Sequence, residues 1–309
     1  MIFTVLLFIL GLILIIIAGD RFVDAAVAIA KASGISDIVI GATIVSLGTT
    51  LPEILVSTTA SFSGSADIAV GNAFGSIICN TALIAGIVML IRPEKNADRK
   101  SISWRILFFF VAVAVCFLFG LRTGSYGLVS GVILVGMFVV YALVSIFSRT
   151  SGKSEGGPGA QQISVPKNIL ILIICAAMLF VGARLLVTQG TKLALALGVP
   201  ERVVAVTFIA LGTSLPELVT AISSLIKGHA DVSIGNILGA NLINLLLVIG
   251  IPALLSGVTP SAAALTTDLP IAALSMAVLA LPMIAFRRGF RVQGALLLAG
   301  YIAYTITQF

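Results

Sequence analysis

Charged residues are scarce in this sequence. Twelve acidic and 18 basic side chains make up 10% of its 309 residues, whereas hydrophobic residues make up 59%. Soluble globular domains carry about 25% charged residues, so this composition excludes an ordinary soluble domain. Regular alternation of apolar and polar residues is also lacking, which argues against a β-barrel. The apolar residues instead form runs of about 18 or more, typical of a helical protein that crosses a membrane several times.

Histidine and cysteine are nearly absent. The only histidine, His229, lies in a predicted connection, and Cys79, Cys116 and Cys175 lie in apolar segments without a Cys-x-x-Cys spacing. The chain therefore lacks the side-chain ligands for a zinc or soft-metal site. We expect neither a cofactor nor enzyme activity. The net charge of +6 does not indicate a nucleic-acid partner, because most Lys and Arg lie in short connections, where they orient a protein in the bilayer.

Ten apolar segments qualify as membrane spans. The polar stretch 149–166, with Ser, Gly, Lys, Glu and two Pro, is the only composition break, and we expect it to be a flexible linker. Fourteen of the 18 Lys and Arg lie in or beside connections after odd-numbered spans, which predicts extracellular termini and a cytoplasmic linker. The predicted spans are 2–19, 37–62, 67–91, 102–121, 126–148, 167–187, 201–226, 231–255, 268–286 and 290–308.

The two halves on either side of this linker repeat one another. Fourteen positions between 43 and 80 recur identically 164 residues later. Because each half has an odd number of spans, the second must enter the membrane upside down. The sequence thus predicts an all-α polytopic membrane protein, with ten transmembrane helices in two inverted five-helix repeats, 1–148 and 167–309. This plan is typical of secondary transporters, with a site near the midplane where the repeats meet.

A helix breaker and a carboxylate interrupt the second and seventh spans. The second contains Gly-Thr-Thr-Leu-Pro-Glu, ending at Glu53, and the seventh contains Gly-Thr-Ser-Leu-Pro-Glu, ending at Glu217. Pro52 has no N–H, and its ring clashes with the carbonyl of Gly48, so we expect both spans to break or unwind here, with Gly48 adding backbone freedom. A carboxylate near the bilayer centre costs at least ~2.5 kcal/mol, so Glu53 and Glu217 are expected to face an interior site.

A second repeated segment follows each break. Ser76 and Asn80 are four residues apart, so both can present oxygens to one point. Asn244 is the repeat partner of Asn80, and we expect both amides to be ligands. Gly71 and Gly75 predict close approach of another helix. For Asn72 and its partner Asn236 we favour a structural role, bonding the unwound backbone of the neighbouring span.

Oxygen atoms dominate the candidate ligands in these repeated segments. Calcium takes 6–8 oxygen ligands at ~2.3–2.6 Å and suits a cage with two carboxylates, while sodium is also an oxygen-seeking ion and magnesium fits less well. One cage can therefore serve calcium and sodium in turn. The donors are the carboxylates of Glu53 and Glu217, the hydroxyls of Thr49, Thr50, Thr213, Ser214 and Ser76, the amides of Asn80 and Asn244, and backbone carbonyls.

With these motifs in both halves, the chain resembles the calcium/cation antiporter superfamily, specifically its sodium/calcium exchanger branch of prokaryotic type. The resemblance implies that the broken second and seventh spans face one another, and that long, tilted first and sixth helices slide as a pair. It implies shared ion binding by Glu53 and Glu217 and backbone carbonyl ligands at Ser46 and Ala210. The remaining ligands that it implies are Thr49, Thr50, Thr213, Ser214, Ser76, Asn80 and Asn244.

Two positions depart from the family pattern. Asn244 stands where several relatives carry Asp, which makes potassium co-transport less expected, and Ala240 stands where Ser is common, which removes one hydroxyl. The expected function is exchange of calcium for sodium across the cell membrane by alternating access. A proton-coupled calcium exchanger of the same fold is the alternative, and a passive channel is disfavoured by the repeat. The expected partners are the two ions and the lipid bilayer, with no obligatory protein partner.

Overall fold

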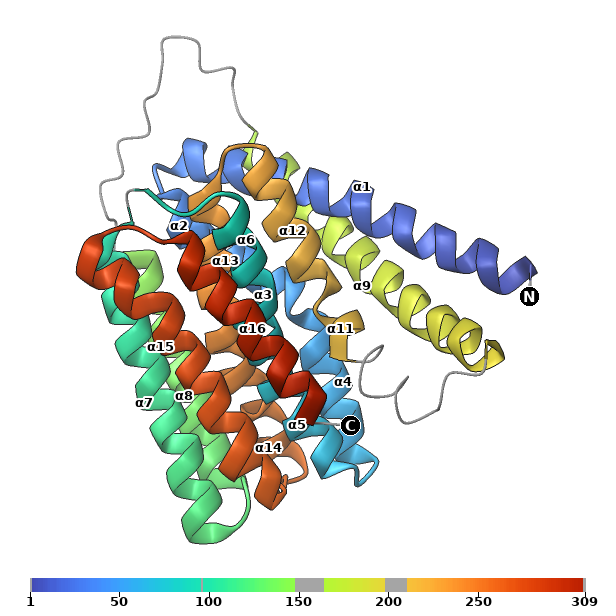
Figure 1. Ribbon diagram of the computed structural model, residues 1–309, viewed down its shortest axis with the longest axis vertical. Helices are drawn as coiled ribbons and strands as arrows, with labels where there is room; N and C mark the ends of the chain where they lie inside the picture. The colour runs from blue at the N-terminus through green and yellow to red at the C-terminus, as the bar shows by residue number, and fades with distance from the viewer. Residues whose placement is uncertain (1, 96, 148–163, 198–209, 308–309) are drawn as a thin grey trace.

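The computed structural model describes residues 2–95, 97–147, 164–197 and 210–307, and within these ranges it contains helices and no strand (Figure 1). The labels α and η denote α-helices and π-helical turns. The elements are α1 (Ile2–Ser33), α2 (Asp37–Ile40), η1 (Gly41–Val45), α3 (Ser46–Thr49), α4 (Leu51–Phe62), α5 (Ala66–Ile78), η2 (Cys79–Ile84), α6 (Ala85–Ile91), α7 (Arg99–Thr123), α8 (Leu128–Phe147), α9 (Val165–Ala196), α11 (Ala210–Thr213), α12 (Leu215–Ile226), α13 (Ala230–Ile243), η4 (Asn244–Val248), α14 (Gly250–Leu255), η5 (Ala264–Asp268), α15 (Leu269–Phe286) and α16 (Arg291–Thr307).

Seven of the described helices are long and apolar enough to cross a membrane. An eighth span results if Asp37–Thr49 and Leu51–Phe62, which meet at a bend of 43°, are taken together. The helices α12 and α16 are shorter, at 12 and 17 residues. Residues 201–209, the first arm of the predicted seventh span, lie outside the described residues, as do 149–163 of the linker. The ten-span count and the inversion of the second half therefore stay predictions.

The first and sixth predicted spans are shorter than the helices that contain them. Residues 2–19 were expected to span, whereas α1 continues for 14 more residues, and α9 runs nine residues beyond the predicted end at 187. Asp20, Arg21 and Asp24 do not end α1, because they point outward while Phe22 and Val23 are buried. The helices α1 and α9, each of 32 residues, lie side by side at an angle to the rest of the bundle (Figure 1).

Small residues allow α1 and α9 to touch. A Cβ added to Gly11 would lie 2.9 Å from the carbonyl oxygen of Gly182, and a Cβ on Gly182 would lie 2.9 Å from that of Gly11. This mutual backbone approach is the packing mode that glycine permits between membrane helices. The two helices therefore pack closely against one another here, and their sliding as a pair stays a prediction.

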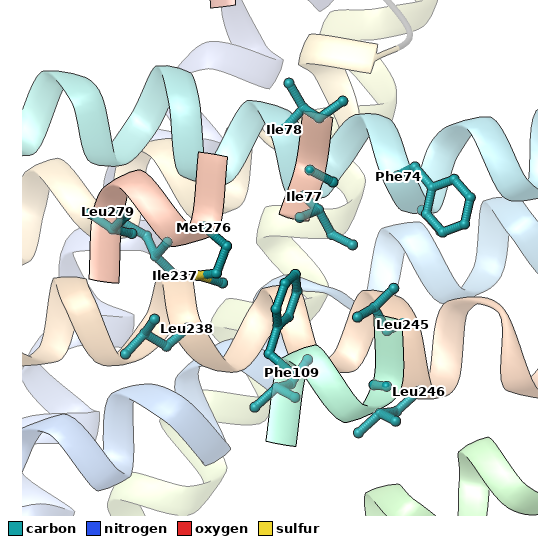
Figure 2. Packing of buried hydrophobic residues seen from close by; sticks show 14 of the residues in the cluster. Phe74, Ile77, Ile78, Phe109, Ile237, Leu238, Leu245, Leu246, Met276 and Leu279 are labelled. Atoms are coloured by element: carbon teal, nitrogen blue, oxygen red, sulfur yellow. The ribbon is translucent and has the colours of Figure 1, made fainter. Parts of the chain in front are cut away.

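The centre of the bundle consists of the two spans that carry the second repeated segment. In an apolar 18-residue stretch of Ile68–Ile91 and of Ala230–Leu255, 72% and 89% of the residues are buried, whereas the share in the corresponding stretch of α1 is 22%. Figure 2 shows Phe74 and Ile77 of the first packed with Ile237 and Leu245 of the second, with Phe109 of α7 nearby. Large apolar side chains on outer helices are exposed, as expected for a lipid-facing surface. Cys79, Cys116 and Cys175 are buried free thiols, as predicted.

Candidate functional site

Both Leu-Pro-Glu motifs open a new helix directly after a break. The break residues Thr50 and Ser214 have nearly the same backbone angles, φ −86° and ψ 1° against φ −87° and ψ 7°. The proline that follows sits in the first turn of α4 or α12, where its missing N–H costs no helical hydrogen bond. Glu53 and Glu217 therefore lie in the first turn, close to the positive end of their helix.

The glycine of each motif has a different role from the expected one. Gly48 lies within α3, two residues before the break, so its backbone freedom does not produce the interruption. It allows close packing, because a Cβ there would lie 2.6 Å from the ring of Phe22 on α1, which would have to shift. Its counterpart Gly212 would clash in the same way with Val187 on α9. The glycines thus bring the break segments onto the paired long helices.

Hydroxyls from each break reach the carboxylate of the other. Thr50 donates to Oε1 of Glu217 at 3.0 Å, and Ser214 donates to Oε1 of Glu53 at 3.5 Å. Thr50 and Ser214 are 164 positions apart, as are Glu53 and Glu217, so the two contacts are counterparts in the repeat. All four residues are buried, and both glutamates are 0% exposed. The structure therefore brings both predicted carboxylates and two predicted hydroxyls into one enclosed cluster.

A second reciprocal pair surrounds the first. Thr49 donates to Oδ1 of Asn236 at 3.3 Å, and Thr213 donates to Oδ1 of Asn72 at 3.3 Å. The amide nitrogen of Asn72 donates to the backbone carbonyl of Glu53 at 3.2 Å. The predicted structural role of Asn72 is therefore confirmed, since it holds the chain at the start of the helix after the break.

Two hydroxyls that sequence reasoning missed support the same region. Asn236 does not reach the backbone directly; its amide donates at 3.1 Å to Thr220, whose hydroxyl donates to the carbonyls of Pro216 at 2.8 Å and Glu217 at 3.1 Å. Ser57 accepts from Asn72 at 2.9 Å. Their spacing in the sequence could have indicated them, because Ser57 and Thr220 follow Glu53 and Glu217 by about one helical turn.

The predicted ligands outside the breaks lie on α5 and on two π-helical turns. Ser76 lies 3.4 Å from the hydroxyl of Ser214 and so joins the cluster. Asn80 is in η2, which packs against α12, and Asn244 begins η4, which packs against α4. π-helical turns inside α-helices are frequent at functional sites. Each amide is thus held next to the helix that carries a predicted carboxylate ligand.

Several buried polar atoms in this region have no hydrogen-bond partner. They are Oε2 of Glu53, Oε2 of Glu217, and both side-chain amide atoms of Asn80 and Asn244. An unpaired buried polar group costs about 1–3 kcal/mol, and more when it is charged. Carboxylate and amide oxygens left in this state have the donor chemistry that hard cations prefer. The cluster therefore fits an oxygen-ligated cation.

Of the two residues expected to bind a cation through their carbonyls, the structure describes the carbonyl of Ser46 but does not test that of Ala210. The carbonyl of Ser46 already accepts from the backbone N–H of Thr50 at 3.0 Å and from the hydroxyl of Thr49 at 3.4 Å. Ala210 is the first residue of α11. Its ligand role stays a prediction, because residues 198–209 and the side chain of Ala210 lie outside the part of the chain that the structure describes.

A contact between α13 and η2 had no signal in the repeat. The amide of Asn241 donates to the hydroxyl of Thr81 at 2.6 Å, and both residues are fully buried. Their counterparts at the 164-residue offset are Ile77 and Leu245, so neither polar residue is duplicated. This bond ties together the two central spans beside Asn80 and Asn244.

Glycines in the second central span allow very close packing. A Cβ on Gly235 would lie 2.3 Å from the carbonyl oxygen of Ile38, and one on Gly239 would lie 2.4 Å from that of Ala42. For Gly71 and Gly75, where close approach was predicted, no described residue lies within 4 Å of an added Cβ. By the 164-residue offset, the residues that correspond to Ile38 and Ala42, and that Gly71 and Gly75 would approach, are residues 202 and 206. Both lie outside the described ranges, so that prediction stays untested.

A cavity of about 490 Å³ lies between α4 and α9, beside the two breaks. Its inner wall includes Pro52, which precedes Glu53, and Thr213, which contacts Asn72. Its outer wall includes Leu55 and Thr59 of α4 and the stretch 180–188 of α9, which contributes Arg184. The space therefore connects the surface of the bundle with one side of the two breaks.

The related interface between α1 and α12 is closed. A Cβ on Gly19 would lie 2.5 Å from the side chain of Val219, so the two helices touch. Further along, Ser223 donates to Asp20 at 3.1 Å, and Nζ of Lys227 lies 2.6 Å from carboxylate oxygens of both Asp20 and Asp24. The α1 and α12 helices thus touch at this interface, whereas a cavity lies between α4 and α9.

Comparisons with known proteins identify the family of this chain. The model described as "Sodium/calcium exchanger protein" matches residues 3–147 and 167–309. The putative antiporter CaxA of Alkalimonas amylolytica is 32% identical, with 95% of each chain covered. The sodium/calcium exchanger MaX1 of Methanosarcina acetivorans is 28% identical, with 98% of each chain covered. The inner membrane protein YrbG of Escherichia coli is 33% identical over 83% of this chain and 81% of its own.

Solved structures agree with these relatives. The sodium-calcium exchanger NCX_Mj soaked with 2.5 mM Na⁺ and 0.1 mM Ca²⁺ superposes with a TM-score of 0.83 at 31% identity, covering 98% of this chain and 97% of its own. The same exchanger without either ion gives a TM-score of 0.84 at 30% identity, with 100% and 99% covered. The resemblance inferred from the two hexapeptide motifs is thereby confirmed: this chain belongs to the sodium/calcium exchanger protein family.

Proposed function

We propose that this protein is a secondary antiporter that exchanges calcium for sodium across the cell membrane by alternating access. Calcium, or a set of sodium ions, would occupy the cluster between the two breaks. Glu53 and Glu217 would be the shared ligands. The remaining oxygens would come from Ser46, Thr49, Thr50, Ser76, Asn80, Ala210, Thr213, Ser214 and Asn244.

One observation carries this proposal. Glu53 and Glu217 come from opposite halves of the chain, are completely buried, and each retains one carboxylate oxygen without a hydrogen-bond partner. Two carboxylates enclosed among hydroxyls are costly without a positive charge between them. A divalent cation balances both charges at once, and more than one sodium ion can do the same. Competition for the same ligands would couple the two fluxes.

The asymmetry of the long helices supports an alternating-access cycle. The cavity beside α9 would give the cluster a route to one surface, and the contact of α1 with α12 would close the other route. Sliding of the α1–α9 pair would close the first route and open the second. The loaded cluster would permit this movement, and the empty, doubly charged cluster would oppose it, because its charges would be left unbalanced during the movement.

The orientation follows from the charge distribution. We place both termini outside the cell, the linker 149–166 in the cytoplasm, and the five-helix units 1–148 and 167–309 in opposite orientations. With this orientation the cavity between α4 and α9 opens to the outside, and the Asp20–Lys227 contact lies on the cytoplasmic side. No cofactor and no obligatory protein partner enter this scheme.

A flux measurement in proteoliposomes tests the exchange. Vesicles loaded with sodium and diluted into sodium-free buffer containing radioactive calcium should accumulate calcium, and dissipating the sodium gradient should stop the uptake. The variant Glu53→Gln should lose uptake, whereas Glu94→Gln, the same substitution outside the cluster, should retain it. Calcium uptake that ignores the sodium gradient, or that survives Glu53→Gln, contradicts the proposal.

The alternative is coupling to protons in the same cluster. Glu53 and Glu217 could each bind a proton at the oxygen that no hydrogen bond occupies, which would balance the loss of calcium. The hydroxyls of Thr50 and Ser214 beside the carboxylates favour sodium, which needs several neutral oxygen ligands. A pH gradient imposed without sodium separates the two: calcium uptake under that gradient alone would favour the proton-coupled reading.

A further inference from the structure

The two halves of the cluster differ by a pair of serine-to-alanine exchanges. Ser76 on α5 has Ala240 on α13 as its counterpart 164 residues later, and Ser46 on α3 has Ala210 on α11. Both serines therefore lie in the first half of the chain, and both alanines lie in the second. The second half supplies no hydroxyl at either position.

At the first position, the serine has a clear contact. Ser76 lies 3.4 Å from the hydroxyl of Ser214, which in turn donates to Glu53. By the repeat, a hydroxyl at position 240 would stand next to Thr50, the counterpart of Ser214, and Thr50 donates to Glu217. Ala240 is fully buried and supplies no oxygen there. The Glu217 side of the cluster therefore lacks one hydroxyl on α13.

The hydroxyl of Ser46 approaches α13 at this place. A Cβ added to Gly239, the residue before Ala240, would lie 2.4 Å from Oγ of Ser46. Ser46 is four residues before Thr50, so the two side chains lie on one face of the segment, and both residues are 0% exposed. Oγ of Ser46 thus faces α13 at Gly239, one residue before Ala240.

The two oxygens of Ser46 differ in their bonding. Its carbonyl accepts from the N–H of Thr50 at 3.0 Å, and the one hydroxyl proton of Thr49 is shared between this carbonyl at 3.4 Å and Oδ1 of Asn236 at 3.3 Å. Its hydroxyl donates to the carbonyl of Thr43 at 3.1 Å, which uses the proton and leaves the oxygen lone pairs. A hydroxyl oriented in this way is a neutral ligand for a hard cation.

We propose that the side-chain hydroxyl of Ser46 is a cation ligand on the Glu217 side of the cluster, in place of the hydroxyl that Ala240 cannot supply. The ligand has moved across a helix contact, from α13 to α3. This inference rests on the proposed exchange function, since it concerns the same cluster. It adds that the chain tunes ion affinity through Ser46, with a donor that is the side chain rather than the backbone.

The test is direct ion binding to the purified full chain in detergent, without a transport step. Titration with calcium, and with sodium in competition, should show about tenfold weaker calcium binding for Ser46→Ala than for the wild type. Ala240→Ser in the Ser46→Ala background should restore affinity to within about threefold. Thermal unfolding in detergent accompanies each titration. An unfolding transition of Ser46→Ala close to that of the wild type shows that this chain folds.

A matched control is Ser224→Ala. Ser224 is buried, its hydroxyl donates to a carbonyl four residues back, and it lies outside the cluster on α12, so binding should not change. Unchanged binding in Ser46→Ala, equal loss in Ser224→Ala, or no recovery with Ala240→Ser would overturn the inference. A failure of sodium-driven uptake would count against the exchange mechanism instead, because this titration does not require coupled flux.

Discussion

Thr50 donates a 3.0 Å hydrogen bond to Oε1 of Glu217, a residue 167 positions away in the other half of the chain. In the counterpart contact, Ser214 donates a hydrogen bond to Oε1 of Glu53. Each hydroxyl thus orients the carboxylate of the opposite half, and neither half can form the cluster alone. The two carboxylates are therefore fixed by side chains that a cation would also contact.

Removing one of these hydroxyls should weaken ion binding without unfolding the chain. Thr50→Val keeps the volume of the side chain but loses the donor to Glu217, so that carboxylate is less well oriented. We expect calcium affinity to fall about tenfold, the equivalent of one lost hydrogen bond to a charged group. Isothermal titration of the purified variant gives the value. Thr58→Val on the same helix, α4, is the control, and an equal loss there would refute a role specific to Thr50.

Asn72 is expected to act on stability as well as on binding. Its amide holds the carbonyl of Glu53 and the hydroxyl of Ser57, and its oxygen accepts from Thr213. Asn72→Leu removes all three bonds in a partly buried setting, which should cost roughly 1–3 kcal/mol of stability. Chemical unfolding in mild detergent, compared with the more exposed Asn168→Leu, measures the difference. Equal midpoints for the two variants would contradict the structural role of Asn72.

Much of the fold follows from hydropathy and proline placement. The predicted span 37–62 has the bounds of the bent pair, and the break falls at Thr50, as expected from Pro52. Those features depend on local chemistry, which a sequence carries completely. The extension of α1 past residue 19 was missed, because a run of apolar residues marks the membrane interior and not the end of a helix.

The site was predictable in composition and less so in arrangement. Duplication drew attention to Glu53 and Glu217, but it could not indicate Thr81 and Asn241, which occur once each. Nor could it indicate which side of the cluster is open. The two hexapeptides are nearly equal, and conformers of a transporter differ by a few kcal/mol, which no local motif encodes.

The contact of Lys227 with Asp20 and Asp24 should hold the α1–α12 side closed. Burial tends to lower the pKa of the Lys227 ammonium, but its hydrogen bonds to the two carboxylates outweigh burial and raise that pKa. A group with a raised pKa stays charged at every pH below it, so the contact should persist from about pH 7 to about pH 9. Both carboxylates are more than half exposed, so each pair contributes only about 0.2–1 kcal/mol.

Loss of both pairs should therefore raise the open population by about two- to thirtyfold. Val219→Cys places a thiol at the closed α1–α12 interface, and its labelling by an impermeant reagent reports opening. Labelling should be faster in Lys227→Met than with Lys227 intact, and the rate with Lys227 intact should not change between about pH 7 and about pH 9. Lys31→Met, a change on the same face of the membrane, is the control. Identical labelling with and without Lys227 would show that the contact does not hold this side closed.

The packing of α13 on the second span leaves no space for a side chain at Gly239. A Cβ there would lie 2.4 Å from both the carbonyl oxygen of Ala42 and Oγ of Ser46, and a backbone carbonyl has little room to move. Gly239→Ala should therefore cost roughly 1–3 kcal/mol through overpacking, and should weaken calcium binding by displacing Ser46. At Gly136 on α8, no described residue lies within 4 Å of an added Cβ, so Gly136→Ala should leave both quantities unchanged. Unfolding midpoints and calcium titrations of the two variants decide the matter, and a Gly239→Ala chain that behaves like Gly136→Ala would mean that α13 and α3 are not in close contact in the protein.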